Sequence, residues 1–336
     1  MQKKVTIEEI AQRANVSIAT VSRIINNKGS VKEDTRQNIL NIMNEMNFSP
    51  KTHSILADSK SKCILLCVPD FHNPFIGSVI NGIQTCARTN GYTILVMQDN
   101  PIIGINYEEL LKNISIAGII VFCSIPNAKS LEDLSLRCPI VVCSERAENH
   151  SISHVVIDDK QSAYTAVNYL ISTGCEKIAL FNCSKNYKYA RYREEGYLEA
   201  MNDANLKIDP EMMINISSVD YKLAYSNAVL LLSNEKKPDA IFACSDVFAV
   251  AIISAANKLG IKIPQELSVI GFDNTYLSTM SEPTLTTIAQ PSYQLGFQSC
   301  EILLDKILND NSTLKQITLE TELIVRKSTK LNLHQK

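Results

Sequence analysis

Apolar and polar side chains recur at helical spacing in three short stretches near the start of the chain. The first stretch opens with Thr6 and Glu9, the capping-box pattern that begins a helix, and it ends at a turn near residue 15. The second runs from Ser17 to about Asn26, and the third covers residues 33–48. Three short helices with a tight first turn predict a helix-turn-helix unit.

From Cys63 onward the pattern changes, because short and nearly continuous apolar runs now alternate with helical stretches. The runs are CILLCVP, YTILVMQ, AGIIVFC, PIVVCS, HVVIDD, KIALFNC, DAIFACS, LSVIGF and TTIAQP. Strands that are apolar throughout are typical of parallel sheets with helices on both faces. The pattern therefore predicts an α/β body, in which ligands bind at the carboxyl ends of the strands.

The second predicted helix combines an apolar face with a face of small hydroxyl side chains and one arginine. Its outer positions hold Ser17, Thr20, Ser22 and Arg23. Such a face is slim enough for the DNA major groove, where hydroxyls donate to phosphates and a guanidinium forks onto guanine. The alternative, from the pattern alone, is an ordinary core helix with Ser and Thr on its solvent side.

The charge of the chain is distributed unevenly. Residues 1–62 contain ten Lys and Arg against six Asp and Glu, which gives this segment +4 and leaves −6 for the rest of a chain whose net charge is −2. We call residues 1–62 the head and the rest of the chain the body. A small basic head on a larger acidic body indicates that the head binds a polyanion.

Composition restricts the class of protein further. A chain of 336 residues with 45% apolar side chains predicts a globular protein of two or three domains. No apolar run reaches the ~18 residues that span a bilayer. The N-terminus shows no apolar signal segment, so we expect a cytoplasmic protein. The ten cysteines form no C-x-x-C pair and have no histidine at metal-ligand spacing, so we expect free thiols, no metal site and no cofactor.

The stretch IEEIAQRANVSIATVSRII, residues 7–25, resembles the signature of the lactose-repressor family of bacterial transcription regulators. The resemblance implies that Ile18, Ala19 and Arg23 face base edges in the major groove. It also implies phosphate contacts by polar side chains of the same unit, namely Thr6, Ser17, Thr20, Ser22, Asn26 and Thr35. Lys32 departs from the family pattern, which usually has a helix-capping Ser at this position.

The segment FSPKTHSILADSKSK follows the third helix, which Pro50 ends. In the resembled family, a hinge helix here orders on the operator and wedges a leucine into the minor groove. Leu56 is the expected wedge, although counting from Pro50 puts Ala57 at the usual spacing. The alternative is a flexible linker in which Leu56 packs on the body.

The body resembles the effector-binding core of the same family, which is similar to periplasmic sugar-binding proteins and consists of two doubly wound parallel-sheet subdomains. Matching positions imply effector contacts by Phe75, Arg193, Tyr221, Ser245, Asp273 and Gln290. Arg193 offers a forked donor and Asp273 two acceptor oxygens, which together can bridge adjacent hydroxyls of a sugar. Alternatively, Arg193 and Asp273 form a structural ion pair, or each caps a helix. Ser144 and Glu145 stand where the family often has Asp-Arg, which points to an unusual effector.

The resemblance implies the following limits: a helix-turn-helix DNA-binding domain over 1–47, a hinge over 48–61, an N-terminal effector subdomain over 62–160 and 291–320, and a C-terminal one over 161–290 and 321–330. We expect a homodimeric repressor of double-stranded operator DNA, controlled by a small-molecule effector that is a sugar or sugar derivative. Whether the effector induces or corepresses stays open. Alternatives are a catabolite-control regulator whose corepressor is a phosphorylated carrier protein, and a purine- or nucleoside-responsive regulator.

Two other classes fit the sequence less well. An enzyme on a doubly wound sheet needs a phosphate loop or a nucleophile, and the chain has no G-x-G-x-x-G, G-x-x-x-x-G-K-[ST] or G-x-S-x-G motif. A periplasmic binding protein is disfavoured by the basic head and by the lack of an export signal. We therefore expect a regulator and no catalysis.

Overall fold

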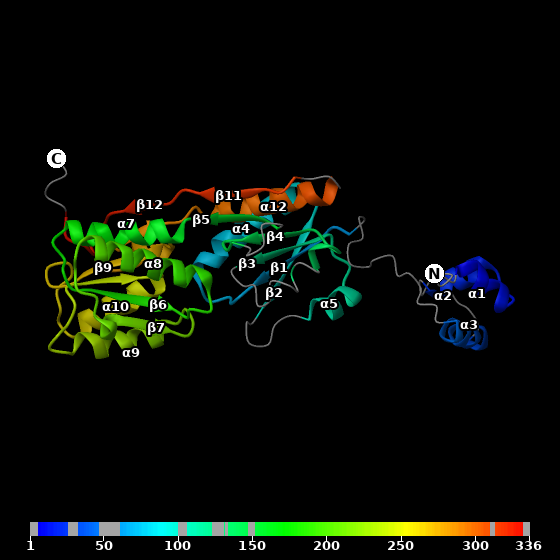
Figure 1. The fold of residues 1–336 in the computed structure, drawn as a ribbon, viewed down its shortest axis with the longest axis horizontal. Helices are drawn as coiled ribbons and strands as arrows, with labels where there is room; N and C mark the ends of the chain where they lie inside the picture. The colour runs from blue at the N-terminus through cyan, green and yellow to red at the C-terminus, as the bar shows by residue number, and fades with distance from the viewer. Residues whose placement is uncertain are drawn as a thin grey trace. The chain divides into compact units, whose positions relative to one another are not determined.

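A computed structural model of the chain describes residues 6–25, 33–46, 61–99, 106–122, 131, 134–146, 152–309 and 313–331. It divides the chain into two compact units, Met1–Ile55 and Leu56–Lys336, which are seen in Figure 1. Among the expected functional residues, Asn26 and Leu56 lie outside the described residues, and so do the side chains of Ser22 and Arg23.

The N-terminal unit contains the three predicted helices, α1 (Ile7–Arg13), α2 (Ile18–Ile25) and α3 (Glu33–Glu45). The predicted capping box is confirmed, because Thr6 Oγ1 accepts from Glu9 N at 3.3 Å and Glu9 Oε2 accepts from Thr6 N at 2.9 Å. The apolar faces of the helices form one small core of Ile10, Ala11, Ala14, Val21, Ile24, Ile39, Ile42 and Met43. The unit is therefore held together by the inward stripes that the sequence shows.

The C-terminal unit contains two six-stranded sheets (Figure 1). The first sheet has the strand order β11-β5-β4-β3-β1-β2, and the second has the order β12-β10-β9-β8-β6-β7. All neighbours pair in parallel except β10 and β12. The strands are β1 (Cys63–Val68), β2 (Thr93–Gln98), β3 (Gly118–Phe122), β4 (Ile140–Cys143), β5 (Ser153–Ile157), β6 (Ile178–Cys183), β7 (Met213–Ile216), β8 (Ala240–Ala243), β9 (Ser268–Asp273), β10 (Thr286–Ala289), β11 (Gln316–Leu319) and β12 (Glu322–Ile324).

Helices cover both faces of each sheet. On the first sheet, α4 and α12 pack on one face and α5 on the other; on the second, α7 and α8 pack mainly on one face and α9 and α10 on the other. The helices of this unit are α4 (Pro74–Thr89), α5 (Tyr107–Asn113), α7 (Asp159–Ser172), α8 (Lys188–Asp203), α9 (Tyr221–Leu232), α10 (Asp246–Lys258), α11 (Tyr276–Met280), α12 (Ser292–Leu308) and the 3₁₀ helix η2 (Pro210–Met212). The predicted α/β body of doubly wound sheets is confirmed.

The chain crosses between the two sheets three times. It crosses after β5 into α7, after β10 into α12, and again between β11 and β12, where the orange and red end of the ribbon in Figure 1 passes from one sheet to the other. These three crossings connect the two sheets. The carboxyl edges of the sheets face each other, because residues at the strand ends of both sheets line one cleft. This is the arrangement in which parallel sheets place ligand sites.

Helices α4 and α12 approach each other closely at two glycines. A Cβ at Gly82 would collide with the carbonyl oxygen of Tyr293, and a Cβ at Gly296 would collide with the carbonyl oxygen of Val79. Contact between the two backbones therefore requires glycine at both positions. Within the part of the chain that the structure describes, no helix has the length and apolar character needed to cross a membrane.

Candidate functional site

The second helix of the head presents a mixed outer surface. Ile18 is 51% exposed and Ala19 is exposed, whereas Val21 and Ile24 on the same helix are buried in the head core. Ser17 Oγ accepts from Thr20 N at 3.2 Å, so Ser17 caps α2 at the start of the helix that the sequence predicts. The residues expected to face DNA bases are therefore not used for packing, as far as their side chains are described.

A cleft of about 710 Å³ lies between the carboxyl edges of the two sheets. All six residues expected to contact an effector line it. Phe75 comes from the first sheet's side, at the start of α4, and Gln290 comes from the crossover after β10. The second sheet's side supplies Arg193, Tyr221, Ser245 and Asp273. The structure thus brings together residues that span more than 200 positions of the sequence, and it does so because each follows or ends a parallel strand.

Arg193 is held in place by a partner that the sequence did not reveal. Its Nε donates to Asp159 Oδ1 at 2.8 Å, its Nη2 lies 2.8 Å from the same oxygen, and its Nη1 donates to the carbonyl of Cys244 at 2.5 Å. The guanidinium also lies 3.6 Å from the centre of the Phe272 ring. These contacts engage three of the five N–H donors of an arginine, so two remain for a ligand.

Asp273 is the acceptor that faces Arg193, with 4.0 Å between Arg193 Nη1 and Asp273 Oδ1. Gln290 Nε2 donates to Asp273 Oδ1 at 2.7 Å, and Ser245 Oγ donates to Asp273 Oδ2 at 3.3 Å. Burial raises the pKa of Asp273 to about 8, against the opposing effect of Arg193. Gln290 Oε1 is buried without a hydrogen-bond partner among the described residues, so it too is an acceptor available to a ligand.

Aromatic rings line both walls of the cleft. On the first sheet's side, Phe75 and Phe122 pack with their ring centroids 6.0 Å apart. On the opposite side, Tyr187 and Tyr189 stack at 5.4 Å, and Tyr221 is 42% exposed. Sequence reasoning found Phe75 and Tyr221 but missed the other three rings. Their positions at or just after the carboxyl ends of β3 and β6 are the signal that could have identified them.

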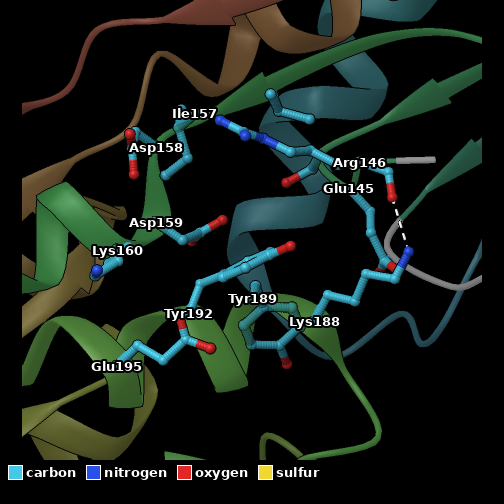
Figure 2. A pocket seen from close by; sticks show the side chains of 12 residues that line it. Glu145, Arg146, Ile157, Asp158, Asp159, Lys160, Lys188, Tyr189, Tyr192 and Glu195 are labelled. Carbon is cyan, nitrogen blue, oxygen red and sulfur yellow. Dashed lines mark hydrogen bonds and ion pairs between the residues drawn. The ribbon is translucent and has the colours of Figure 1, made fainter. Parts of the chain in front are cut away.

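A smaller pocket of about 180 Å³ adjoins the cleft and shares Ser144 and Tyr189 with it. Figure 2 shows the side chains that line this back pocket. The carboxylate of Asp159 points into it from the start of α7, and Lys188 and Glu145 meet at its far side. The back pocket therefore contains side chains that follow strands of both sheets.

Two families match this chain. The family described as bacterial regulatory proteins, lacI family, matches residues 6–51, and a periplasmic binding protein-like domain matches residues 167–329. These matches fall on the three-helix unit and on all strands of the second sheet with most of its helices, together with α12 and β11 of the first sheet.

Relatives match over nearly the whole chain. The HTH-type transcriptional regulator DegA of Bacillus subtilis (strain 168) is 35% identical over 333 residues, which cover 97% of this chain and 98% of that protein. The HTH-type transcriptional repressor CytR of Escherichia coli (strain K12) is 31% identical and covers 97% and 96%. A solved LacI family transcriptional regulator from Enterococcus faecium, with bound ribose, is 26% identical with a TM-score of 0.72, and covers 80% of this chain and 100% of that one.

The capped three-helix head, the two parallel sheets with a cleft between them and relatives of matching length agree with one another. The chain therefore belongs to the lacI family of bacterial regulatory proteins, as a DNA-binding transcriptional regulator with an effector-binding core.

Proposed function

We propose that this regulator is a cytoplasmic, homodimeric repressor whose cleft binds an uncharged sugar or sugar derivative. The observation that carries the proposal is the pairing of Arg193 with Asp273 between two aromatic walls. Arg193 has two free N–H donors, and its Nη1 lies 4.0 Å from Oδ1 of the Asp273 carboxyl group, a spacing that suits adjacent hydroxyl groups. Phe75 and Tyr221 offer apolar faces for the ring itself.

The charges of the cleft favour a neutral ligand over an anionic one. The positive charge of Arg193 is already balanced by Asp159, and Lys222 is the other Lys or Arg among the described residues that line the cleft. Asp70, Asp220 and Asp273 line the same cleft. A sugar phosphate or nucleotide would bring its charge close to the acidic side chains of Asp70 and Asp220, so we expect these ligands to bind weakly. The ribose bound by the Enterococcus faecium regulator is an uncharged sugar of the expected class.

For the head, we propose that Ile18, Ala19 and Arg23 read base edges and that Thr6, Ser17, Thr20, Ser22, Asn26 and Thr35 contact phosphates. The exposure of Ile18 and Ala19 on α2 supports this assignment. Leu56 is proposed as the minor-groove wedge of the hinge. We also propose that the effector subdomains are 62–160 with 291–320 and 161–290 with 321–330, a division that the order of strands in the two sheets supports.

Exposed apolar side chains on neighbouring helices support the homodimer. Leu230 of α9, Leu259 after α10 and Met280 of α11 are 70%, 38% and 75% exposed. The three helices contact one another in sequence, and large exposed apolar side chains on contacting elements are candidates for a protein interface. Sedimentation equilibrium tests the assignment: Met280→Glu should shift the chain from dimer to monomer, and a monomeric wild type would contradict it.

The effector would act only through its different affinity for two arrangements of the subdomains. Induction and corepression differ in which arrangement holds the operator more tightly. A thermal-shift panel of monosaccharides, disaccharides, nucleobases and sugar phosphates tests the ligand class. We expect neutral sugars to raise the melting temperature of the wild type and not of Asp273→Ala, which should still bind operator DNA. Stabilisation by sugar phosphates or nucleobases alone would overturn the proposal.

A further inference from the structure

Lys188 joins the two sheets across the back pocket. It is the first residue of α8, which follows β6 of the second sheet, whereas Glu145 and Arg146 follow β4 of the first sheet. Lys188 Nζ donates to the carbonyl oxygen of Arg146 at 2.9 Å and lies 3.8 Å from Glu145 Oε1. Figure 2 shows the hydrogen bond as a dashed line on the side of the pocket opposite Asp159.

The contact is buried on both sides. The Lys188 side chain is 11% exposed and that of Glu145 is 5% exposed. A buried ammonium group needs hydrogen-bonding partners, because its transfer from water is costly without them. Separation of the two sheets at this point would break both of these contacts at once. The contact therefore stabilises the described arrangement of the sheets relative to any arrangement in which this edge is open.

Two other charged contacts of the site join elements that pack on the second sheet or follow its strands. Arg193 and Asp159 belong to α8 and α7, which pack against each other on the second sheet. Lys185 and Glu194 form an ion pair of 2.7 Å that also stays on this side. Lys188 differs from them because its partners lie in the segment after β4 of the first sheet and not on a helix that packs on the second sheet.

We propose that Lys188 is a latch between the two subdomains, closed on Glu145 and Arg146, and that it sets how readily the cleft accepts its effector. A ligand that touches both walls needs the arrangement in which the walls face each other. Its apparent affinity therefore scales with the population of that arrangement, which the latch raises. The part of this inference that concerns the effector rests on the proposed function, whereas the part that concerns the latch does not.

The ligand-free test is hydrogen–deuterium exchange on the full-length protein. Lys188→Met keeps the length of the side chain and removes its charge and its donors. We expect amide exchange in peptides covering 144–146 and 185–190 to become at least about tenfold faster, as the loss of a hydrogen bond to a charged group would allow. Lys185→Met is the matched control, because it removes a partly exposed ion pair near the start of the same helix, and it should leave exchange at 144–146 unchanged.

Glu145→Gln separates the two components of the latch, since it removes the carboxylate charge and leaves the bond to the carbonyl of Arg146 possible. We expect it to give a smaller increase in exchange than Lys188→Met, with thermal unfolding verifying that each variant is folded. Equal exchange at 144–146 in wild type, Lys188→Met and Lys185→Met would overturn the latch.

The panel sugar with the largest thermal shift then tests the effector part. Its dissociation constant should be about tenfold higher for Lys188→Met than for Lys185→Met. Equal constants, with faster exchange still observed, would remove the link to the effector and leave the latch. A panel in which no sugar binds the wild type would refute the proposed function and leave the exchange result standing.

Discussion

Arg193 and Asp159 meet through a single carboxylate oxygen, since both Nε and Nη2 of the arginine lie 2.8 Å from Asp159 Oδ1. Both side chains are buried. The pair holds the guanidinium over the Phe272 ring, where Arg193 lines the cleft. Asp159 is therefore a positioning residue for the arginine that the effector is proposed to contact.

Removal of Asp159 should destabilise the protein strongly. Asp159→Ala removes the nearest acidic partner of a buried guanidinium, which costs about 3–5 kcal/mol. Asp158→Ala is the control at the preceding residue, where Asp158 Oδ1 accepts from Gln161 N at 2.9 Å and caps α7. The loss of that cap should cost about 1 kcal/mol. Urea unfolding of both variants measures the difference, and similar losses would contradict the assigned role of Asp159.

The close approach of α4 and α12 gives a second prediction. Gly296→Ala places a methyl group against the carbonyl oxygen of Val79, so the helices must separate, and we expect a loss of about 1–3 kcal/mol. Gly77 lies in α4, the helix that contains Val79, and an added Cβ at this position has no atom within 4 Å. Gly77→Ala should therefore stabilise the protein by about 0.5–1 kcal/mol. If the two variants shifted the unfolding midpoint in the same direction, the packing argument would fail.

The raised pKa of Asp273 predicts how its contribution to stability depends on pH. Between its ordinary value of 3.8 and its value of about 8 in the folded chain, the folded state binds a proton that the unfolded state has released. Stability from this residue is therefore fully present below pH 3.8 and falls as the pH rises toward 8.

Asp273→Asn removes this titration, and asparagine tolerates the positive φ of 110° at this position better than most residues. The free energy of unfolding of the variant minus that of the wild type should increase as the pH rises from 5 to 8, because only the wild type loses stability through this titration. Burial also raises the pKa of the neighbouring Asp246, to about 6, so the difference between the two proteins is the informative quantity. A difference that does not change with pH would show that Asp273 is ionised throughout.

Most strands could be predicted because they are buried on both faces. Runs such as CILLCV and IALFNC contain few or no polar positions, and the structure buries nearly every residue in them. The sequence did not reveal β7, β11 and β12, which are short, lie at sheet edges and alternate or remain half-exposed. An edge strand has fewer apolar positions, so its pattern resembles that of a loop.

The candidate site also contains residues that could be predicted from the sequence and contacts that could not. Residues of the cleft could be predicted where they end or follow a strand, as Asp273 and Ser245 do. Asp159 also ends a predicted strand run, HVVIDD, but its pairing with Arg193 could not be predicted because the two residues are 34 positions apart on different helices. The contact of Lys188 with Arg146 spans 42 residues and two sheets, so it depends on how the crossings bring the sheets together. Spacing along one chain carries no signal for such a contact.

Arg23 should carry sequence preference in DNA binding. It belongs to α2, the family resemblance implies that it faces base edges in the major groove, and a guanidinium can fork onto guanine there. Operators can be selected from random duplexes with the wild-type protein and then tested by fluorescence anisotropy at fixed salt. Arg23→Ala should lose about 1–3 kcal/mol on the selected site and relax one base position. Arg13 is the control: it lies on α1 with its side chain 58% exposed and 3.5 Å from Glu45, so Arg13→Ala should keep the wild-type preference. If Arg23→Ala selected the same sequences as the wild type with unchanged affinity, α2 would not read bases through this residue. The sequence preference would then have to come from Ile18 and Ala19 or from the shape of the DNA.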